Sequence, residues 1–285
     1  GHVDIDQIIN IKIFAKYLAI NDYFGAIHGS RDWSDYRLYY NPITTLFEPI
    51  AYDLTDYWTN KFPDRELIIE KENLPFLSKI TSNHLFQKNY IFELSELVRT
   101  NFFRKTIRKY SNEIGLYVEL IMNDNRIYPQ FKKYPFVESD ILDTTYLNKR
   151  HSYIENVLDQ EHRLHAYFER AINDSLVINI GNAHALPVEL IEIKLNNYIA
   201  ANSNKKQIIN GMKQKDNLIK YRRYFFNLAN ENIKIDFNTS LKLRYKKLGL
   251  DKIFETKINM WSNKMATEKV FKNAIFSPNV TDFEQ

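Results

Sequence analysis

The densest group of potentially reactive side chains lies near the start of the chain. It consists of one histidine and four aspartates: His28, Asp32, Asp35, Asp53 and Asp56. Carboxylates that converge repel one another unless a cation lies between them, and Mg²⁺ bound to phosphate oxygens is the usual hard partner. The pattern therefore predicts either a Mg²⁺–phosphate site or ordinary surface-turn acids, of which Asp35 or Asp56 would cap a neighbouring turn.

A predicted β-hairpin separates the two halves of this polar group. Residues 36–40 and 46–52 have the composition of short strands, and 41–45, which begin with Asn-Pro, have that of a turn. Asp32 and Asp35 lie just before the first strand, and Asp53 directly follows the second. Because a hairpin brings the outer ends of its two strands together, we expect these acids to meet at one point.

Helical periodicity precedes and follows the hairpin. The first predicted helix begins at a capping aspartate, Asp4 or Asp6, and ends before Gly25. Further helices are predicted at 84–99, 101–123 and 142–172. The last of these would place His162 and His165 on one face, but a histidine pair without a third ligand favours a solvated or hydrogen-bonded pair over a metal site.

The last part of the chain has the shorter period of β-strands. We therefore predict an α+β protein with a mostly helical part at 1–173 and a β-rich module at 174–285. Residues 196–216, rich in Asn, Lys and Ser, are predicted to form a long loop. Strands are predicted at 175–180, 188–193, 224–228, 232–237, 241–246 and 254–261.

Composition excludes several classes of protein. The chain of 285 residues has no cysteine, which excludes a disulfide scaffold and a thiolate metal site. Its 19 tyrosines and 19 phenylalanines carry too much apolar surface for a disordered chain. Only 7 glycines are present, and no glycine-rich phosphate loop is found. No apolar run approaches the roughly 18 residues of a membrane span, so none is expected.

Charge divides the chain unevenly. From Ala201 onward, lysine and arginine outnumber aspartate and glutamate by 17 to 8, whereas before it acids outnumber bases by 27 to 22. The shift predicts a boundary near Ala200. Basic and aromatic residues are interleaved at 220–226, a pattern that fits nucleic-acid binding or an edge strand protected by its charges. No nucleic-acid-binding motif accompanies them, so we favour the edge strand.

Four segments together resemble a known family. They are YLAIND at 17–22, DYRLYYNP at 35–42, LFEPIAYD at 46–53 and GNAHALPVE at 181–189. In this order and spacing they are similar to the CotH-type kinases, atypical protein kinases related to spore-coat protein H. The likeness is close over the polar loop and hairpin and weaker through the helical part.

The resemblance implies a kinase C-lobe with an Mg²⁺–ATP site. It assigns Asp32, with His28 in the same loop, to the catalytic loop, and Asp35 and Asp53 to cofactor and metal binding. Asp56 would be a further metal ligand. The implied substrate is a Ser or Thr hydroxyl of an exported or surface protein of a bacterium, and the implied location is extracellular or in the cell envelope.

Departures from the pattern shape the expected function. Asp32 and Asp35 are three residues apart rather than the five of ordinary kinase loops, and an aspartate stands at 35 where the family has asparagine. Gly1-His2 resembles a cleavage scar, and no nucleotide-covering lobe precedes the first helix, so we expect a fragment that is inactive alone. The alternative is a non-catalytic, pseudokinase-like binding or structural module of a cell-surface protein.

Overall fold

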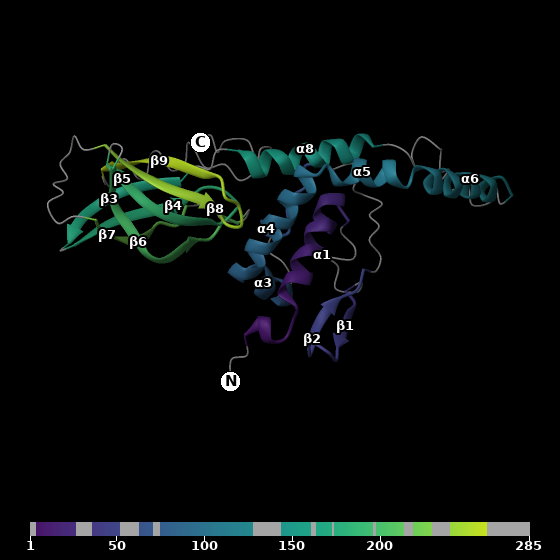
Figure 1. Ribbon diagram of the computed structural model, residues 1–285, viewed down its shortest axis with the longest axis horizontal. Coiled ribbons are helices and arrows are strands. Elements are labelled where there is room, and N and C mark those ends of the chain that lie inside the picture. Colours follow the sequence, from purple (N-terminus) through teal and green to yellow (C-terminus); the bar gives the residue numbers. More distant parts are fainter. Residues whose placement is uncertain are drawn as a thin grey trace.

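The computed structural model combines a helical part with a closed β-barrel (Figure 1). The α+β class predicted from the sequence is confirmed at this level. No helix within the described ranges combines the length and the apolar composition that a membrane crossing requires. The structure describes residues 4–26, 36–51, 63–70, 75–127, 144–160, 164–172, 174–195, 198–213, 219–229 and 240–260.

The first helix, α1 (Ile11–Phe24), is capped at both ends by the sequence itself. The Asn10 side chain accepts a hydrogen bond from the backbone N–H of Ile13, which satisfies one of the free donors of the first turn. Gly25 ends the helix in the left-handed conformation, with φ of 70°. The predicted cap at Asp4 or Asp6 was wrong, because Asp4 precedes and Asp6 lies within a short 3₁₀ helix, η1 (Ile5–Gln7), and α1 begins only at Ile11.

The predicted hairpin is present as β1 (Leu38–Asn41) and β2 (Leu46–Pro49). Glu48 on β2 accepts hydrogen bonds from the side-chain amides of Asn41, at 3.1 Å, and Asn10, at 3.2 Å. Backbone bonds join Phe47 to Ile8 and Asn10 as well. The hairpin is therefore fixed to the segment that leads into α1, as Figure 1 shows.

The helical part is built around α1 and a second helix, α4 (His84–Arg99), that packs against it. The predicted helix 84–99 is confirmed as α4, whose N-terminus is capped by Asn83. The predicted helix 101–123 is instead two helices, which meet at Tyr110. The helices that accompany α1 and α4 are α3 (Pro75–Thr81), α5 (Phe102–Lys109), α6 (Ser111–Ile127) and α8 (Thr145–Asp159).

The predicted helix 142–172 was wrong in its second half. It ends at Asp159, and Leu164–Ile172 form strand β3. The ammonium of Lys247 donates to the carbonyls of Leu158, at 2.5 Å, and Gln160, at 2.7 Å, and so supplies donors to the carbonyls at the end of α8. His165 is therefore a strand residue, while His162 lies outside the described residues.

Seven strands close into a barrel in the order β3-β4-β7-β6-β5-β8-β9. Neighbours are antiparallel except β3 and β9, which close the barrel in parallel. Alternate side chains fill the interior; on β8, for example, positions 241, 243, 245 and 247 are buried. The remaining strands are β4 (Ser175–Asn182), β5 (Val188–Leu195), β6 (Tyr198–Ile209), β7 (Arg222–Leu228), β8 (Leu241–Lys247) and β9 (Ile253–Met260).

The barrel corrects three expectations drawn from composition. The predicted loop 196–216 is largely strand β6, since its polar side chains can face outward while Ala200 and Ala201 are buried. The predicted boundary near Ala200 therefore falls inside a barrel strand. The segment predicted as an edge strand is β7, which pairs with β4 on one side and β6 on the other. The predicted strand 232–237 lies outside the described residues.

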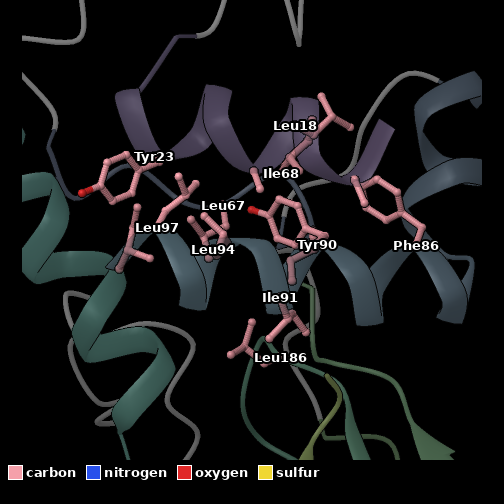
Figure 2. Packing of buried hydrophobic residues seen from close by; sticks show 14 of the residues in the cluster. Leu18, Tyr23, Leu67, Ile68, Phe86, Tyr90, Ile91, Leu94, Leu97 and Leu186 are labelled. Carbon is pink, nitrogen blue, oxygen red and sulfur yellow. The ribbon is translucent and has the colours of Figure 1, made fainter. Parts of the chain in front are cut away.

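One hydrophobic cluster joins the helical part to one end of the barrel, and the barrel interior has a second cluster of its own. Leu18 of α1 and Tyr90 and Leu94 of α4 belong to one buried cluster, part of which Figure 2 shows. Leu186 and Leu248, from turns at one end of the barrel, belong to the same fully buried cluster. Each such leucine contributes roughly 1.5–3 kcal/mol to stability, so the contact between the two parts is a stable packing surface.

Candidate functional site

The hairpin brings together the outer ends of its two strands, which lead into two acidic segments, 27–35 before β1 and 52–62 after β2. The carbonyl of Arg37 accepts a hydrogen bond from the N–H of Ile50 at 2.9 Å, which extends the pairing of Leu38 with Pro49. The expectation that the two strand ends lie side by side is therefore confirmed. The first acidic segment precedes Tyr36 directly, and the second begins just after Ala51.

The predicted site residues themselves lie outside the described residues. His28, Asp32 and Asp35 fall within 27–35, and Asp53 and Asp56 fall within 52–62. Their convergence remains a prediction. Elsewhere, in the ranges that the structure describes, no three His, Asp or Glu side chains gather as a metal site.

A buried polar network connects the residues just before the first acidic segment with those just after the second. Asp22, on the last turn of α1, accepts hydrogen bonds from the hydroxyl of Tyr90, at 2.5 Å, and from the N–H of Ile68, at 2.8 Å. These partners come from α4 and from the chain at 63–70. An aspartate buried with two donors is held in one orientation, so the end of α1 is fixed just before the first acidic segment.

Arg150 of α8 completes this network. Its guanidinium donates to the backbone carbonyl of Asp22 at 2.7 Å and to the carbonyls of Pro63, at 3.2 Å, and Arg65. Arg150 is only 1% exposed, and a buried guanidinium requires such partners. One side chain thus ties the helix before the first acidic segment to the residues that directly follow the second.

Glu70 adds a titratable group to the same buried region. Its side chain is 2% exposed, and burial raises its pKa to about 8, although the positive charge of Arg150 opposes the rise and the negative charge of Asp22 adds to it. The carboxyl group is therefore mostly protonated at neutral pH.

Tyr36 marks the entrance of the hairpin. Its ring packs edge-on against Phe76 with a centroid distance of 6.4 Å. Burial raises the pKa of its hydroxyl well above the usual value, and the nearby Tyr17 adds to the rise. The hydroxyl therefore stays protonated at every physiological pH.

The motif at 181–189 has a structural role in the described residues. Asn182 organises the turn after β4: it accepts from the N–H of His184 at 3.0 Å and donates to the carbonyls of Leu186, at 2.9 Å, and Asn210, at 3.1 Å. His184 lies in this turn. Burial lowers the pKa of its imidazole to about 3, so the ring is neutral. The turn presents Leu186 to the helical core.

Sequence reasoning missed the network around Asp22. The pattern YLAIND contains Asp22, but its partners lie 46, 68 and 128 positions away along the chain. The only local signal was an aspartate on the last turn of an apolar helix, where the helix dipole disfavours a negative charge. A charge in that position implies partners elsewhere in the fold.

Comparison of the chain with protein-family models, with curated proteins and with solved structures finds no match. The protein is therefore defined by its architecture: a helical part with a hairpin, joined through one buried hydrophobic cluster to a closed seven-stranded barrel.

Proposed function

We propose that the chain is the C-lobe part of a CotH-like, Mg²⁺–ATP-dependent protein kinase that phosphorylates Ser or Thr hydroxyls of an exported or surface protein. The observation that carries the proposal is the hairpin, whose paired ends at Arg37 and Ile50 bring the starts of two acidic segments together. Kinase chemistry needs this arrangement, because the catalytic and metal-binding acids come from separate segments.

The network of Asp22, Tyr90 and Arg150 supports the same proposal. A phosphoryl-transfer site works mainly by positioning, and an error of about 1 Å can be costly. Arg150 and Asp22 fix the backbone before the first acidic segment and after the second. The two segments are thereby anchored at their far ends as well as at the hairpin.

In this proposal the acids divide the work. Asp32 accepts the proton as the substrate hydroxyl attacks the γ-phosphorus and the bond to the leaving ADP oxygen breaks. His28 belongs to the same loop. Asp35 and Asp53 hold Mg²⁺ on the nucleotide phosphates, with Asp56 as a further ligand. Transfer by the chain alone is expected to be absent without a nucleotide-covering lobe.

Binding of Mn²⁺–ATP, with Mn²⁺ as a spectroscopic substitute for Mg²⁺, tests the site without requiring transfer. Asp53→Asn should weaken metal-dependent ATP binding by at least about tenfold, because it removes a ligand charge. Asp64→Asn is the matched control, since Asp64 is exposed in the following segment. Equal binding by the wild-type protein and Asp53→Asn would refute the assignment of Asp53.

The second candidate is a non-catalytic binding or structural module of a cell-surface protein. The packing of the barrel against the helices favours it, because Leu186 and Leu248 join the two parts through one buried hydrophobic cluster. This candidate predicts no metal-dependent ATP binding by the wild-type protein. The same titration therefore separates the two functions.

A further inference from the structure

A cavity lies where the barrel end meets the helical part. Its volume is about 230 Å³. From the helical part it is lined by Ile69, Ser82 and Gln87, and from the barrel end chiefly by Asn182, Arg222 and Tyr224 together with the chain at 209–213. The mouth of a barrel is a common place for a small-molecule site.

The strand pattern places a cation at this mouth. Arg222, Tyr224 and Phe226 lie on one face of β7, because side chains alternate along a strand. Phe226 is fully buried in the barrel core, so this is the interior face. Arg222 is the first residue of β7 and stands at the end of this row, where it lines the cavity together with Gln87 of α4.

The cavity lining is basic. Lys213, Lys220 and Arg222 contribute positive charge, and no aspartate or glutamate occurs among the described lining residues. Lys213 is held in position by the carbonyl of Ile69, which accepts from its ammonium at 2.5 Å. Positive side chains around a partly enclosed space create a potential that favours anions.

Gln87 adds an acceptor to this basic lining. Its side chain is 5% exposed, and its amide nitrogen donates to the carbonyl of Thr81 at 2.9 Å. That bond fixes the amide orientation and leaves the oxygen buried, with no hydrogen-bond partner among the described residues. A buried acceptor without a partner is uncommon, and a bound donor would satisfy it.

Backbone atoms around Gly211 and Ala185 form another part of the cavity wall. At Gly211 a Cβ atom would lie 1.6 Å from the carbonyl oxygen of Ala185, so only glycine allows these two segments to approach so closely. The amide of Met212, next to Gly211, donates to the carbonyl of His184. Main-chain packing therefore fixes this part of the cavity wall.

From these features we propose that the cavity binds a small organic oxyanion, a phosphate or a carboxylate, that also carries a hydroxyl or amino group. Arg222 and Lys213 would bind the oxyanion, and the Gln87 oxygen would accept from the hydroxyl or amino group. The volume suits a molecule smaller than the ligands that fill pockets of roughly 300–1,000 Å³. None of the lining residues belongs to 27–35 or 52–62, and the proposal does not depend on the proposed kinase activity.

Calorimetric titration with glycerol 3-phosphate, methyl phosphate, glycerate and inorganic phosphate tests the proposal. Glycerol 3-phosphate should bind more tightly than methyl phosphate, which lacks a hydroxyl, and glycerate reports whether a carboxylate serves as well. Arg222→Gln should weaken binding by about 10- to 100-fold, the usual effect of losing a hydrogen bond to a charged group.

The neighbouring residue provides the matched control. Arg223 lies on the opposite face of β7, where it pairs with Glu169 at 2.8 Å, so Arg223→Gln removes the same charge from the same strand without touching the cavity. Equal weakening by both variants would overturn the proposal in favour of diffuse attraction. No binding of any of the four anions up to about 10 mM would also overturn it.

Gln87→Met tests the acceptor separately, because it keeps the volume and removes the oxygen. It should abolish the preference for glycerol 3-phosphate over methyl phosphate while leaving methyl phosphate binding unchanged. A preference that persists in this variant would refute the role of Gln87. Thermal unfolding of each variant confirms that a lost signal reflects the cavity rather than the fold.

Discussion

Glu70 gives the sharpest prediction for stability. In the folded protein burial raises its pKa to about 8, whereas an exposed glutamate titrates near 4.5. Between these two values the folded state holds a proton that the unfolded state has released. Stability is therefore full below about pH 4.5 and is lost as the pH rises toward 8. Glu70→Gln replaces the acid with a neutral side chain of the same shape and should remove this dependence.

The size of the effect follows from the same two values. Each pH unit between 4.5 and about 8 contributes about 1.4 kcal/mol to the free energy of unfolding, so the full effect approaches about 5 kcal/mol. Between pH 5 and pH 8 the wild-type protein should thus lose about 4 kcal/mol relative to Glu70→Gln. Opposite trends from His184 and Lys247 are common to both proteins and cancel in the difference.

Urea unfolding at pH 5, 6, 7 and 8 measures this difference directly. The control is Glu93→Gln on α4, which leaves the buried acid in place and should keep the wild-type slope. If Glu70→Gln and the wild-type protein lose stability in parallel across this range, Glu70 is ionised in the folded state. The reasoning from burial would then be wrong.

Three further substitutions test contacts that stabilise the fold. Tyr90→Phe removes the donor to Asp22 and should cost about 1.5–3 kcal/mol in urea unfolding, against no change if that bond contributes nothing. Lys247→Met leaves the last carbonyls of α8 without their donor; we expect about 1–3 kcal/mol of destabilisation and faster amide exchange at the end of α8. Gly249→Ala should cost at least about 1 kcal/mol, because φ is 90° and a Cβ atom would lie 2.4 Å from the carbonyl oxygen of Lys88. An unchanged melting temperature for Gly249→Ala would contradict this close packing.

Local sequence patterns correctly predicted the elements that are stabilised mainly by their own residues. Helix 84–99 has its own cap at Asn83 and a complete apolar face, and it is found at its predicted limits. The hairpin has its own turn residues at 41–45. In both cases the physical cause of the structure lies within the element.

Other elements depend on partners far along the chain. β6 contains many polar residues, and it is a strand because β5 and β7 supply its hydrogen bonds. The carbonyls at the end of α8 find their donor in Lys247, on a distant strand. The network around Asp22 likewise joins α1 to three distant segments, so no local spacing in the sequence indicated it. The acids proposed for catalysis rest on sequence pattern and on the hairpin that leads to them.

The hydrophobic cluster that joins the two parts also has a consequence for synthesis. Leu186 and Leu248 close the cluster formed by α1, α4 and α8, yet they leave the ribosome long after those helices. Until then Leu18, Tyr90 and their neighbours lack part of their cover, and the helices cannot reach full stability. Closure of the barrel also waits for β9, which pairs with β3 only at the end. The nascent helical part must therefore persist incompletely packed while nearly 90 further residues are made, and this is when chaperone protection would be most valuable.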